Sequence, residues 1–337
     1  MNVTLKDIAE KSGFSVNTVS RVMRGDPKIS EKTRNIILEI AKEQEYIPDA
    51  IASSMRSAHS KTVGVITADS GNPFFSEVSK GIVEMADKLG YHILLGSTEE
   101  SLRKEKELLK MFVSRHVDGL IVMPVFDAGE EHLQWYHNLS VPFVFPGRYL
   151  PTLEDHAILH GDVQGQKQVF DYLFDNGHRN ILYLSGPKKV SNSRDRLQGM
   201  EESYAEHGIP LDEEYIMETA GHAEDGYALV NQALNKGLRF TAVASFNDLS
   251  AMGALKSLSE NGLKVPEQVE VVGYDNLYMS QFMQPALTTV DVPKYRLGCA
   301  AMESLVSHIN DPSLPYQKQE LPTRLVSRET TRQKIYM

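Results

Sequence analysis

Hydrophobic positions recur along this chain in two different patterns. Up to about residue 46 they return every three or four residues, as on one face of an amphipathic helix. From about residue 62 onward, short continuous apolar runs alternate with longer helical patterns. Continuous apolar strands separated by helices indicate parallel sheets that are covered on both faces. The chain is therefore predicted to have a small helical head and a large α/β body.

The head is predicted to contain a helix-turn-helix. A first helix spans residues 4–12, with Thr4 as a candidate N-cap and Gly13 as its C-terminal stop. A second helix starts at Ser15 and ends near Gly25. Two short helices joined by a tight, glycine-bearing turn are typical of this motif.

A third amphipathic helix and a linker follow. The helix is predicted from Ser30 to about Glu45. Its buried stripe is predicted to be Ile36, Ile37, Ile40 and Ala41. Residues 46–56 then form a helical stretch of about two turns, which is too short to be stable by itself. Such a segment, followed by the polar connector 57–61, is either a simple hinge or a helix that orders only on a partner.

The body is predicted to fold into two doubly wound lobes with a cleft between them, because two series of strands alternate with helices. The first series is predicted at residues 63–67, 92–96, 119–123, 141–145 and 158–160. The second is predicted at residues 181–185, 216–219, 243–246 and 269–273. The expected division is a head (1–46), a hinge helix and linker (47–61), a body (62–330, with lobes 62–160 plus 292–326 and 161–291) and a tail (331–337).

The second helix of a helix-turn-helix enters the major groove of DNA with its N-terminus first. Its exposed start carries small polar residues suited to phosphates and base edges, namely Ser15, Asn17, Thr18 and Ser20. Arg21 lies one turn after Asn17 on the same exposed side, so both side chains can reach neighbouring base edges. A three-helix bundle that binds protein would show the same pattern, so the pattern alone leaves both interpretations open.

Polar residues gather where the strands of the body are predicted to end, and ligands of such sheets bind outside these carboxyl ends. The clusters are Asp69–Phe75, Arg148, Ser193–Gly199, Asn247–Asp248 and Asp275–Asn276. Planar hydrogen-bonding groups with phenylalanines nearby suit a polyol such as a sugar. Taken singly, Asp248 or Asn276 is more often a helix cap or a turn residue, so the shared placement is the stronger indication.

Composition and charge narrow the class of protein. The net charge of −10 divides into +2 for residues 1–61 and −12 for the rest, as expected of a DNA-binding head on an acidic body. A single cysteine, Cys299, excludes an intramolecular disulfide and a cysteine-based metal cluster. No apolar run is long enough to span a membrane, and the early acidic residues do not suit a secretory signal. A cytoplasmic protein without a cofactor is expected.

Three segments of the head and linker resemble the LacI/GalR family of bacterial regulators. They are Val3-Thr4-Leu5-Lys6-Asp7-Ile8-Ala9, Val19-Ser20-Arg21-Val22, and Tyr46-x-Pro48-x-Ala50-x-Ala52 before a Val-Gly-Val-Ile strand. The resemblance implies that Val16, Asn17 and Arg21 read bases. The other expected DNA contacts of the head are Thr4, Leu5, Ser15, Thr18 and Ser20.

The same resemblance implies that residues 48–56 are a hinge helix that folds on the operator and enters the minor groove, with Ala52 and Met55 as DNA contacts. The family usually has a leucine where this chain has Met55. Two such side chains, one per subunit, wedge into a central base step and kink the duplex. Methionine is long and apolar enough to act as a wedge, but its flexibility predicts a softer kink or a different preferred step.

Motifs of the body extend the resemblance over almost the whole chain. They are Asp69-x-x-Asn72-Pro73-Phe74-Phe75, Arg196-x-x-Gly199, Asn247-Asp248, Gly273-Tyr274-Asp275-Asn276 and Pro285-x-Leu287-Thr288-Thr289-Val290. They imply a two-lobed effector domain like that of periplasmic binding proteins, with Arg196, Asn247 and Asp275 as the main effector contacts. Further expected contacts are Asp69, Asn72, Phe74, Arg148 and Asp162. The family often has an aromatic residue before the helix near Glu224, and Tyr227 is the candidate here.

The expected function is a homodimeric repressor that binds a pseudo-palindromic operator in double-stranded DNA and is controlled by a small effector, with a sugar preferred. A purine-type corepressor or a phosphorylated carrier protein is an alternative controller. A freestanding sugar-binding protein would share the body but would need a secretory signal and no head. An enzyme on this scaffold would need a paired acid and base, or a nucleophile with its base, and neither is evident in the sequence.

Overall fold

A computed structural model of the chain describes residues 3–46, 59–126 and 128–332. It divides into two compact units, Met1–Ser60 and Lys61–Met337, which are the head and the body. Ala52 and Met55, the two DNA contacts expected in the hinge helix, lie outside the described residues. Within the described ranges, every helix is too short or too polar to span a lipid bilayer.

Residues 3–46 of the head form three helices, as the sequence predicts. They are α1 (Leu5–Ser12), α2 (Val16–Met23) and α3 (Glu31–Glu43). Thr4 caps α1 in a reciprocal manner, because its backbone N–H donates to the Asp7 carboxylate at 2.7 Å while its hydroxyl accepts from the Asp7 N–H. The core is formed by Ile8, Ala9, Val19, Val22, Ile37 and Ala41. The predicted stripe of α3 was too wide, since Ile36 is 37% exposed.

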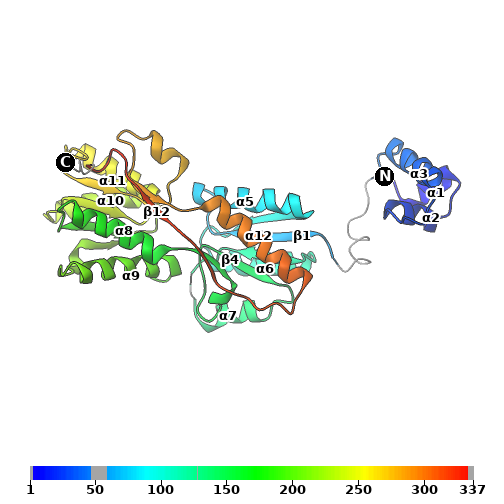
Figure 1. Cartoon of the computed structure of the whole chain (residues 1–337), viewed down its shortest axis with the longest axis horizontal. Helices are drawn as coiled ribbons and strands as arrows, with labels where there is room; N and C mark the ends of the chain where they lie inside the picture. The colour runs from blue at the N-terminus through cyan, green and yellow to red at the C-terminus, as the bar shows by residue number, and fades with distance from the viewer. Residues whose placement is uncertain (1–2, 47–58, 127, 333–337) are drawn as a thin grey trace. The chain divides into compact units, whose positions relative to one another are not determined.

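Lobe 1 is a parallel sheet covered by helices (Figure 1). Its strand order is β11-β5-β4-β3-β1-β2. Its elements are β1 (Thr62–Thr67), α5 (Pro73–Leu89), β2 (His92–Ser97), α6 (Leu102–Ser114), β3 (Gly119–Val122), α7 (Glu130–His137), β4 (Phe143–Pro146), η1 (Glu154–His156), β5 (Ala157–His160), α12 (Lys294–Asn310) and β11 (Gln319–Leu321). The last two come from far along the chain and complete the lobe.

Lobe 2 repeats the arrangement with a parallel sheet of order β7-β6-β8-β9. Its elements are α8 (Asp162–Asp175), β6 (Ile181–Ser185), α9 (Ser191–Glu206), η2 (Glu213–Tyr215), β7 (Ile216–Glu218), α10 (Ala223–Asn235), β8 (Ala242–Ser245), α11 (Asp248–Glu260), β9 (Glu270–Val272), η3 (Tyr278–Phe282), β10 (Thr289–Asp291) and β12 (Arg324–Val326). The two parallel sheets with helices between their strands confirm the predicted two-lobed α/β class.

The chain crosses between the lobes three times. It enters lobe 2 between β5 and α8, returns between β10 and α12, and enters lobe 2 again between β11 and β12. The sequence assigned β12 to lobe 1, whereas the strand pairs antiparallel with β10. Thr331 and Arg332, assigned to a tail, also belong to lobe 2, because Thr331 is buried and Arg332 forms an ion pair with Glu270 at 2.8 Å.

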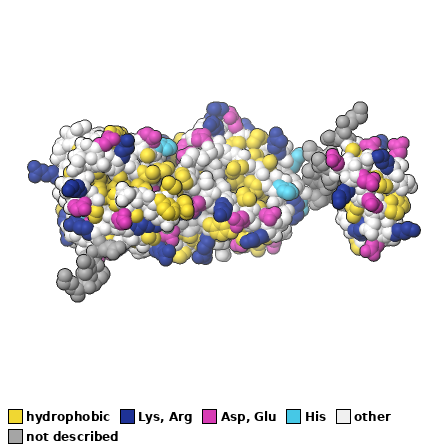
Figure 2. Space-filling model, turned by 90° about the horizontal axis from the view of Figure 1, so that it is seen from above, with side chains coloured by type: hydrophobic (Ala, Val, Ile, Leu, Met, Phe, Trp, Pro, Cys, Tyr) yellow, Lys and Arg dark blue, Asp and Glu magenta, His cyan; other side chains and the backbone are white. Residues whose placement is uncertain are grey.

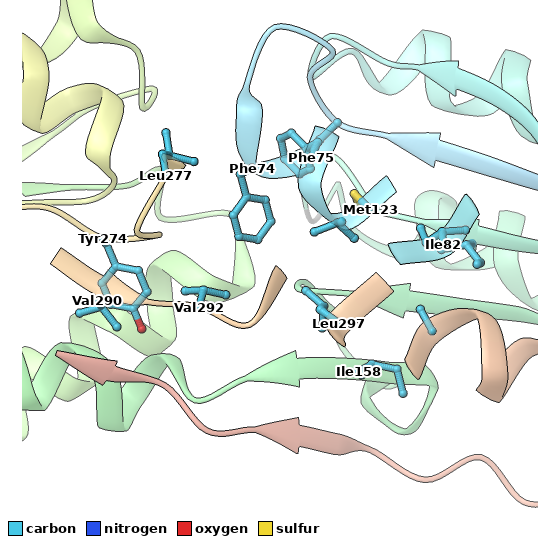
Figure 3. Packing of buried hydrophobic residues seen from close by; sticks show 14 of the residues in the cluster. Phe74, Phe75, Ile82, Met123, Ile158, Tyr274, Leu277, Val290, Val292 and Leu297 are labelled. Carbon is cyan, nitrogen blue, oxygen red and sulfur yellow. The ribbon is translucent and has the colours of Figure 1, made fainter. Parts of the chain in front are cut away.

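A continuous hydrophobic cluster joins the two lobes. Figure 3 shows Phe74 and Leu297 on the lobe 1 side of this cluster and Tyr274 and Val290 on the lobe 2 side. Val292, on the crossing after β10, lies between the two groups and is fully buried. The lobes therefore share part of their core, so that a change in their separation alters the packing at this joint.

Close helix packing in lobe 1 depends on glycine. Helices α5 and α12 lie side by side (Figure 1), and a Cβ added at Gly298 would lie 2.0 Å from the carbonyl oxygen of Val78. On α5, a Cβ at Gly81 would lie 2.1 Å from the carbonyl oxygen of Tyr295. Both distances are far inside van der Waals contact, so the two helix backbones can approach this closely only where no side chain intervenes.

Gly298→Ala tests this close approach. In an open helix the exchange of glycine for alanine stabilises by about 1 kcal/mol. Here we expect a loss of about 1–3 kcal/mol, because the methyl group forces α12 away from α5. Calorimetric unfolding of the purified protein measures the effect, with Ser259→Ala on the exposed face of α11 as the control. If Gly298→Ala instead raised the free energy of unfolding, α12 could move away from α5 without destabilising the protein.

Candidate DNA-binding and effector sites

The N-terminal turn of α2 exposes the side chains that the sequence assigned to base reading. Val16 is 42% exposed and Asn17 is also exposed, while Val19 is fully buried against the other helices. Ser15 caps the helix, since its hydroxyl accepts from the Thr18 N–H at 3.1 Å and contacts the Thr18 hydroxyl at 2.9 Å. The Asn17 amide at the tip forms no hydrogen bond with a residue in the described ranges and is exposed.

Arg21 lies at the other end of the same exposed face and is held in place by Asp26. Its Nε donates to Asp26 Oδ2 at 2.8 Å, and Asp26 Oδ1 accepts from the Lys28 N–H at 2.9 Å. The hydrogen bond from Lys28, together with Arg21, keeps the pKa of Asp26 below its usual value. The terminal Nη groups of Arg21 form no hydrogen bond with a described residue, so they remain for a partner.

Three further residues expected to contact DNA also make contacts within the head, namely Thr4, Leu5 and Ser20. The Thr4 hydroxyl bonds to the Asp7 carboxylate at 2.8 Å. The Leu5 side chain packs against the core of the head. The Ser20 carbonyl accepts from Arg24 Nε at 3.1 Å. These contacts engage Thr4 and Leu5 within the head itself and add no base-reading geometry.

A cavity of about 30 Å³ lies between the lobes at the carboxyl ends of their strands. Six of the eight predicted effector residues line it, namely Asn72, Phe74, Arg148, Arg196, Asn247 and Asp275. Asp69 and Asp162 are not among its lining residues. The volume suffices for one or two water molecules, whereas pockets for small molecules measure about 300–1,000 Å³. The cleft is therefore closed in this conformation.

Arg196 is the central group of the cleft and is almost completely buried. Its Nε donates to Asp162 Oδ1 at 2.7 Å, and its Nη1 donates to the carbonyl oxygen of Phe246. The guanidinium plane stacks on the ring of Tyr274 at 3.6 Å and lies 4.8 Å from the ring of Phe246. Two aromatic rings and two acceptors thus fix both the position and the orientation of Arg196.

Asp162 orients Arg196 from behind the cavity. Its second oxygen, Oδ2, lies 2.9 Å from Nδ1 of His160, which is buried at the end of β5. Burial by itself would raise the pKa of Asp162, but His160 and Arg196 outweigh burial and hold the pKa below its usual value. Asp162 therefore carries a full negative charge and compensates the charge of Arg196.

Asp275 is a second carboxylate near Arg196, at 3.8 Å between Oδ1 and Nη2. It is almost fully buried and has a φ of 108°. Burial raises the pKa of Asp275 to about 7, against the opposing effect of Arg196. The other charged groups that influence it are Asp248, Lys294 and His160. Because Asp162 already neutralises Arg196, little charge remains to stabilise an ionised Asp275.

Arg148 lines the other wall of the cavity and is bound to its own lobe. Its Nη2 donates to Glu100 Oε1 at 2.9 Å, and its Nη1 lies 3.2 Å from Glu100 Oε2. The same Nη1 also donates to the carbonyl oxygens of Pro124 and Val125, both at 3.1 Å. Arg148 therefore enters the cleft with its donors largely occupied.

The two asparagines of the predicted set serve as helix caps. Asn72 Oδ1 accepts from the Phe74 N–H at the start of α5. Asn247 caps α11, with Oδ1 accepting from the Ser250 N–H, while its Nδ2 donates to the carbonyl oxygen of Gly221 at 2.8 Å. Asn247 Oδ1 is thus committed to the helix cap, whereas Nδ2 uses one of its two N–H groups on Gly221.

Asn192 is a cavity residue that the sequence reasoning missed. It lines the cavity, and its Oδ1 is buried without a hydrogen-bond partner among the described residues. Asn192 precedes Arg196 by four positions on α9, so both side chains share one face of the helix. That spacing was a signal available in the sequence. Phe246, which lines the cavity directly before Asn247, was missed as well.

Tyr149 joins the lobes at the rim of the closed cleft. It follows β4 in lobe 1, and its N–H donates to the hydroxyl of Ser191 at 2.9 Å. Its own hydroxyl donates to Asp195 Oδ1 at 2.9 Å. Both partners lie on α9 of lobe 2. Burial, together with Asp195, raises the pKa of Tyr149 to about 12, so the phenol stays protonated and continues to donate.

Comparison with known proteins agrees with this two-part arrangement. Residues 4–49 match the model of the bacterial regulatory proteins of the lacI family, and residues 170–331 match the periplasmic binding protein-like domain. The repressor PurR of Proteus mirabilis (strain HI4320) is 34% identical, with 97% of this chain and 96% of that protein covered. The chain belongs to the LacI family. It is thus a DNA-binding transcriptional repressor and not an enzyme.

Two solved structures of LacI-family proteins resemble the repressor over its whole length. The lac repressor dimer bound to operator and the anti-inducer ONPF has a TM-score of 0.89 at 28% identity, covering 98% of this chain and 99% of that chain. The complex of the regulator CelR with cellobiose has a TM-score of 0.75 at 26% identity, covering 98% and 100%. The head and the two-lobed body thus occur together in both relatives.

Tyr227 does not supply the aromatic ring that was expected at the effector cleft of the repressor. Its hydroxyl donates to Glu260 Oε2 at 2.6 Å, between α10 and α11. It is absent from the residues that line the cavity, whereas Phe74, Phe75 and Phe246 are present. The aromatic surface of this cleft therefore comes from α5 and from the end of β8.

Asp275→Asn tests the buried carboxyl group. A folded pKa of about 7, above the ordinary 3.8, means that the folded protein retains a proton that the unfolded chain has lost. Stability should therefore fall as pH rises from about 4 to about 7. Asp248, with its pKa raised to about 6 by burial, contributes in the same direction. We expect Asp275→Asn to remove roughly half of this fall.

The measurement is the unfolding temperature between pH 4 and pH 8. Asp311→Asn is the control, because Asp311 is exposed and its pKa lies below its usual value. This control should retain the decline of the unaltered protein. An Asp275→Asn protein with the full decline would show that Asp275 is ionised throughout this range.

Proposed function

We propose that the chain is a dimeric repressor of a pseudo-palindromic operator and that a small ligand, a sugar in our view, controls it from the cleft between the lobes. The observation that carries the proposal is the closed cavity around Arg196, with an unpartnered amide oxygen on Asn192. Such a site lies where ligands bind in doubly wound sheets. The protein would act in the cytoplasm, where its operator DNA is found.

The head supports specific DNA binding through α2. Asn17 and Arg21 share its exposed face, and Asp26 holds the Arg21 side chain without using its terminal donors. Asparagine and arginine form bidentate hydrogen bonds with adenine and guanine respectively. The lac repressor structure, which is bound to operator DNA, makes the same mode of binding plausible for this head.

Dimer formation is supported by exposed hydrophobic side chains on the body. They gather on the face that Figure 2 shows. In η3, Tyr278, Met279 and Phe282 are each more than half exposed. In lobe 1, β2 is an edge strand of its sheet, and Leu95 on this strand is 63% exposed. Exposed apolar residues beside a free sheet edge favour an interface with a second subunit.

Control by a ligand follows from the closed cleft. A sugar cannot enter a cavity of about 30 Å³, so the lobes must separate and close again around it. Separation breaks the two hydrogen bonds of Tyr149 with α9 and disturbs the shared core. In a dimer, this movement changes the spacing of the two chains that enter lobe 1 at Lys61, and with it the fit of the two heads to the operator.

A sugar is favoured over a purine by the arrangement of polar groups around the aromatic surface. The relative CelR is in complex with cellobiose, whereas another relative is the repressor PurR. Planar hydrogen-bonding groups such as Arg196 and Asn192 suit the hydroxyl groups of a sugar, with phenylalanine rings against its apolar face. A purine-type ligand is the second candidate because Phe74 and Phe246 could also cover a base.

Arg21→Ala tests the base-reading assignment. Loss of a bidentate contact should weaken specific binding by about 1–3 kcal/mol per half-site and relax the base preference at that position. Lys42→Ala on α3 removes the same charge away from α2 and is the matched control. Fluorescence anisotropy with operator variants measures both effects. Undiminished discrimination by Arg21→Ala would rule out this residue as the base reader.

Asn192→Ala tests the effector site. Arg196 is less suitable for this purpose, because its loss removes the guanidinium from the buried Asp162 and leaves that carboxylate with His160 alone among its described charged partners, which should destabilise lobe 2 by up to about 3–5 kcal/mol. Asn192 can be truncated with little effect on the unliganded protein, within about 0.5 kcal/mol. The ligand-induced rise in unfolding temperature should then shrink or disappear.

The measurement is a thermal-shift screen of the unaltered protein against sugars and purines, repeated with Asn192→Ala. A ligand at a hundred times its Kd stabilises by about 2.7 kcal/mol. Asn261→Ala, an exposed asparagine on lobe 2, is the control and should respond as the unaltered protein does. Stabilisation by purines alone would favour the second candidate. A hit that Asn192→Ala binds equally well would place the ligand elsewhere.

A further inference from the structure

We propose that the cleft accepts an uncharged effector and rejects the phosphorylated or carboxylated form of the same compound. This inference rests on the proposed function, since it concerns the ligand of the same cleft. It follows from the way in which the two guanidinium groups of the cavity are paired. A site for an anion needs a cation with free donors, and here each arginine of the cavity already has a carboxylate of its own.

Arg148 is neutralised within lobe 1. Its two Nη atoms face the two oxygens of Glu100 at 3.2 and 2.9 Å, which is the bidentate geometry that a phosphate would otherwise occupy. The remaining direction of Nη1 is taken by the carbonyl oxygens of Pro124 and Val125. The Arg148 side chain is 11% exposed, whereas that of Glu100 is 41% exposed. An incoming anion would meet Glu100 before it reached the arginine.

Arg196 is neutralised by residues behind the cavity. Its bond with Asp162 at 2.7 Å involves two side chains that are each at most 3% exposed. A charge pair removed from water in this way does not exchange its partner readily, because each ion would lose the compensation for its own burial. Arg196 therefore offers a ligand the Nη donors that Asp162 and Phe246 do not use, but no uncompensated positive charge.

The other charges near the cavity do not restore a positive site. Asp275 adds a carboxyl group whose pKa burial raises to about 7, so it contributes either a neutral acid or a further negative charge. Lys294, behind Asp275, donates to the carbonyl oxygens of Asp275 and Asn276 and lies 3.5 Å from Glu77. Arg194 does not line the cavity and lies 5.9 Å from the ring of Tyr149 at the rim.

The same cavity offers a neutral polyol both hydrogen-bonding groups and aromatic rings. Asn192 Oδ1 accepts from a hydroxyl group, and a protonated Asp275 donates to one. The rings of Phe74 and Phe246 cover the apolar face of the ligand. Closure of the lobes then buries no unpaired charge. For an anion the same closure removes the charge from water without a partner, which opposes binding.

Glu100→Gln separates these two cases. The exchange keeps the shape of residue 100 but frees the charge of Arg148, so the cleft should gain affinity for an anion. The probe is inorganic phosphate, titrated at constant ionic strength and followed by 31P NMR line broadening and by thermal shift. We expect the unaltered protein to show no saturable phosphate binding over the titrated range, and Glu100→Gln to bind phosphate saturably with a Kd at least tenfold below the highest concentration used. Adding Arg148→Ala to Glu100→Gln should remove the gain.

The control is Glu107→Gln, which breaks a similar ion pair with Arg103 at 2.7 Å on the surface of α6. It should behave as the unaltered protein does. Saturable phosphate binding by the unaltered protein, or no gain with Glu100→Gln, overturns the inference. So does a phosphorylated sugar that stabilises the unaltered protein more than the free sugar. If no neutral ligand shifts stability or operator binding, the proposed function fails, while the phosphate titration still decides the charge of the cleft.

Discussion

The ion pair between Asp162 and Arg196 is the constraint on which the two-lobed body of this protein depends. Asp162 begins α8 at the point where the chain first enters lobe 2, and Arg196 lies on the neighbouring helix α9. The pair therefore ties the start of α8, where the chain first enters lobe 2, to helix α9 of that lobe. It also holds the guanidinium between Tyr274 and Phe246, and thereby shapes the cavity. Because the pair is buried, neither partner tolerates the loss of the other.

The closed arrangement of the lobes is held by hydrogen bonds and by a shared hydrophobic cluster. Tyr149 contributes two hydrogen bonds to α9, and the shared hydrophobic cluster contributes apolar contact around Phe74 and Tyr274. Individual hydrogen bonds of this kind stabilise by only about 0.5–1.5 kcal/mol. A hundredfold change in operator occupancy requires a coupling of roughly 2.7 kcal/mol. A ligand that exchanges a few such contacts is therefore sufficient to move the equilibrium between open and closed lobes.

The sequence predicted most of the fold because the central strands of both lobes, such as β1 and β3 in lobe 1 and β6 in lobe 2, are largely apolar runs, and each described head helix begins at a capping residue. Local signals of this kind do not depend on distant parts of the chain. Ile36 was wrongly predicted to be buried because the apolar face of α3 is broader than the part of it that the other two helices cover. Arg148, predicted from its position after a strand, lines the cavity, but its partner Glu100 lies 48 positions away in the sequence and could not be found from residue spacing. The same holds for β12, whose pairing with β10 joins distant segments.

The three crossings have a consequence for the order in which a growing chain can fold on the ribosome. The three described helices of the head have been synthesised by residue 43. Lobe 1 lacks α12 and β11 until residue 321, and lobe 2 lacks the hydrogen bonds of Thr330 with Val271 and Thr288 until almost the last residues. Domains generally form in the order of their synthesis. The described helices of the head can thus fold long before either lobe. The two lobes are completed nearly together, so a nascent chain carries a folded DNA-binding head while both lobes are still incomplete.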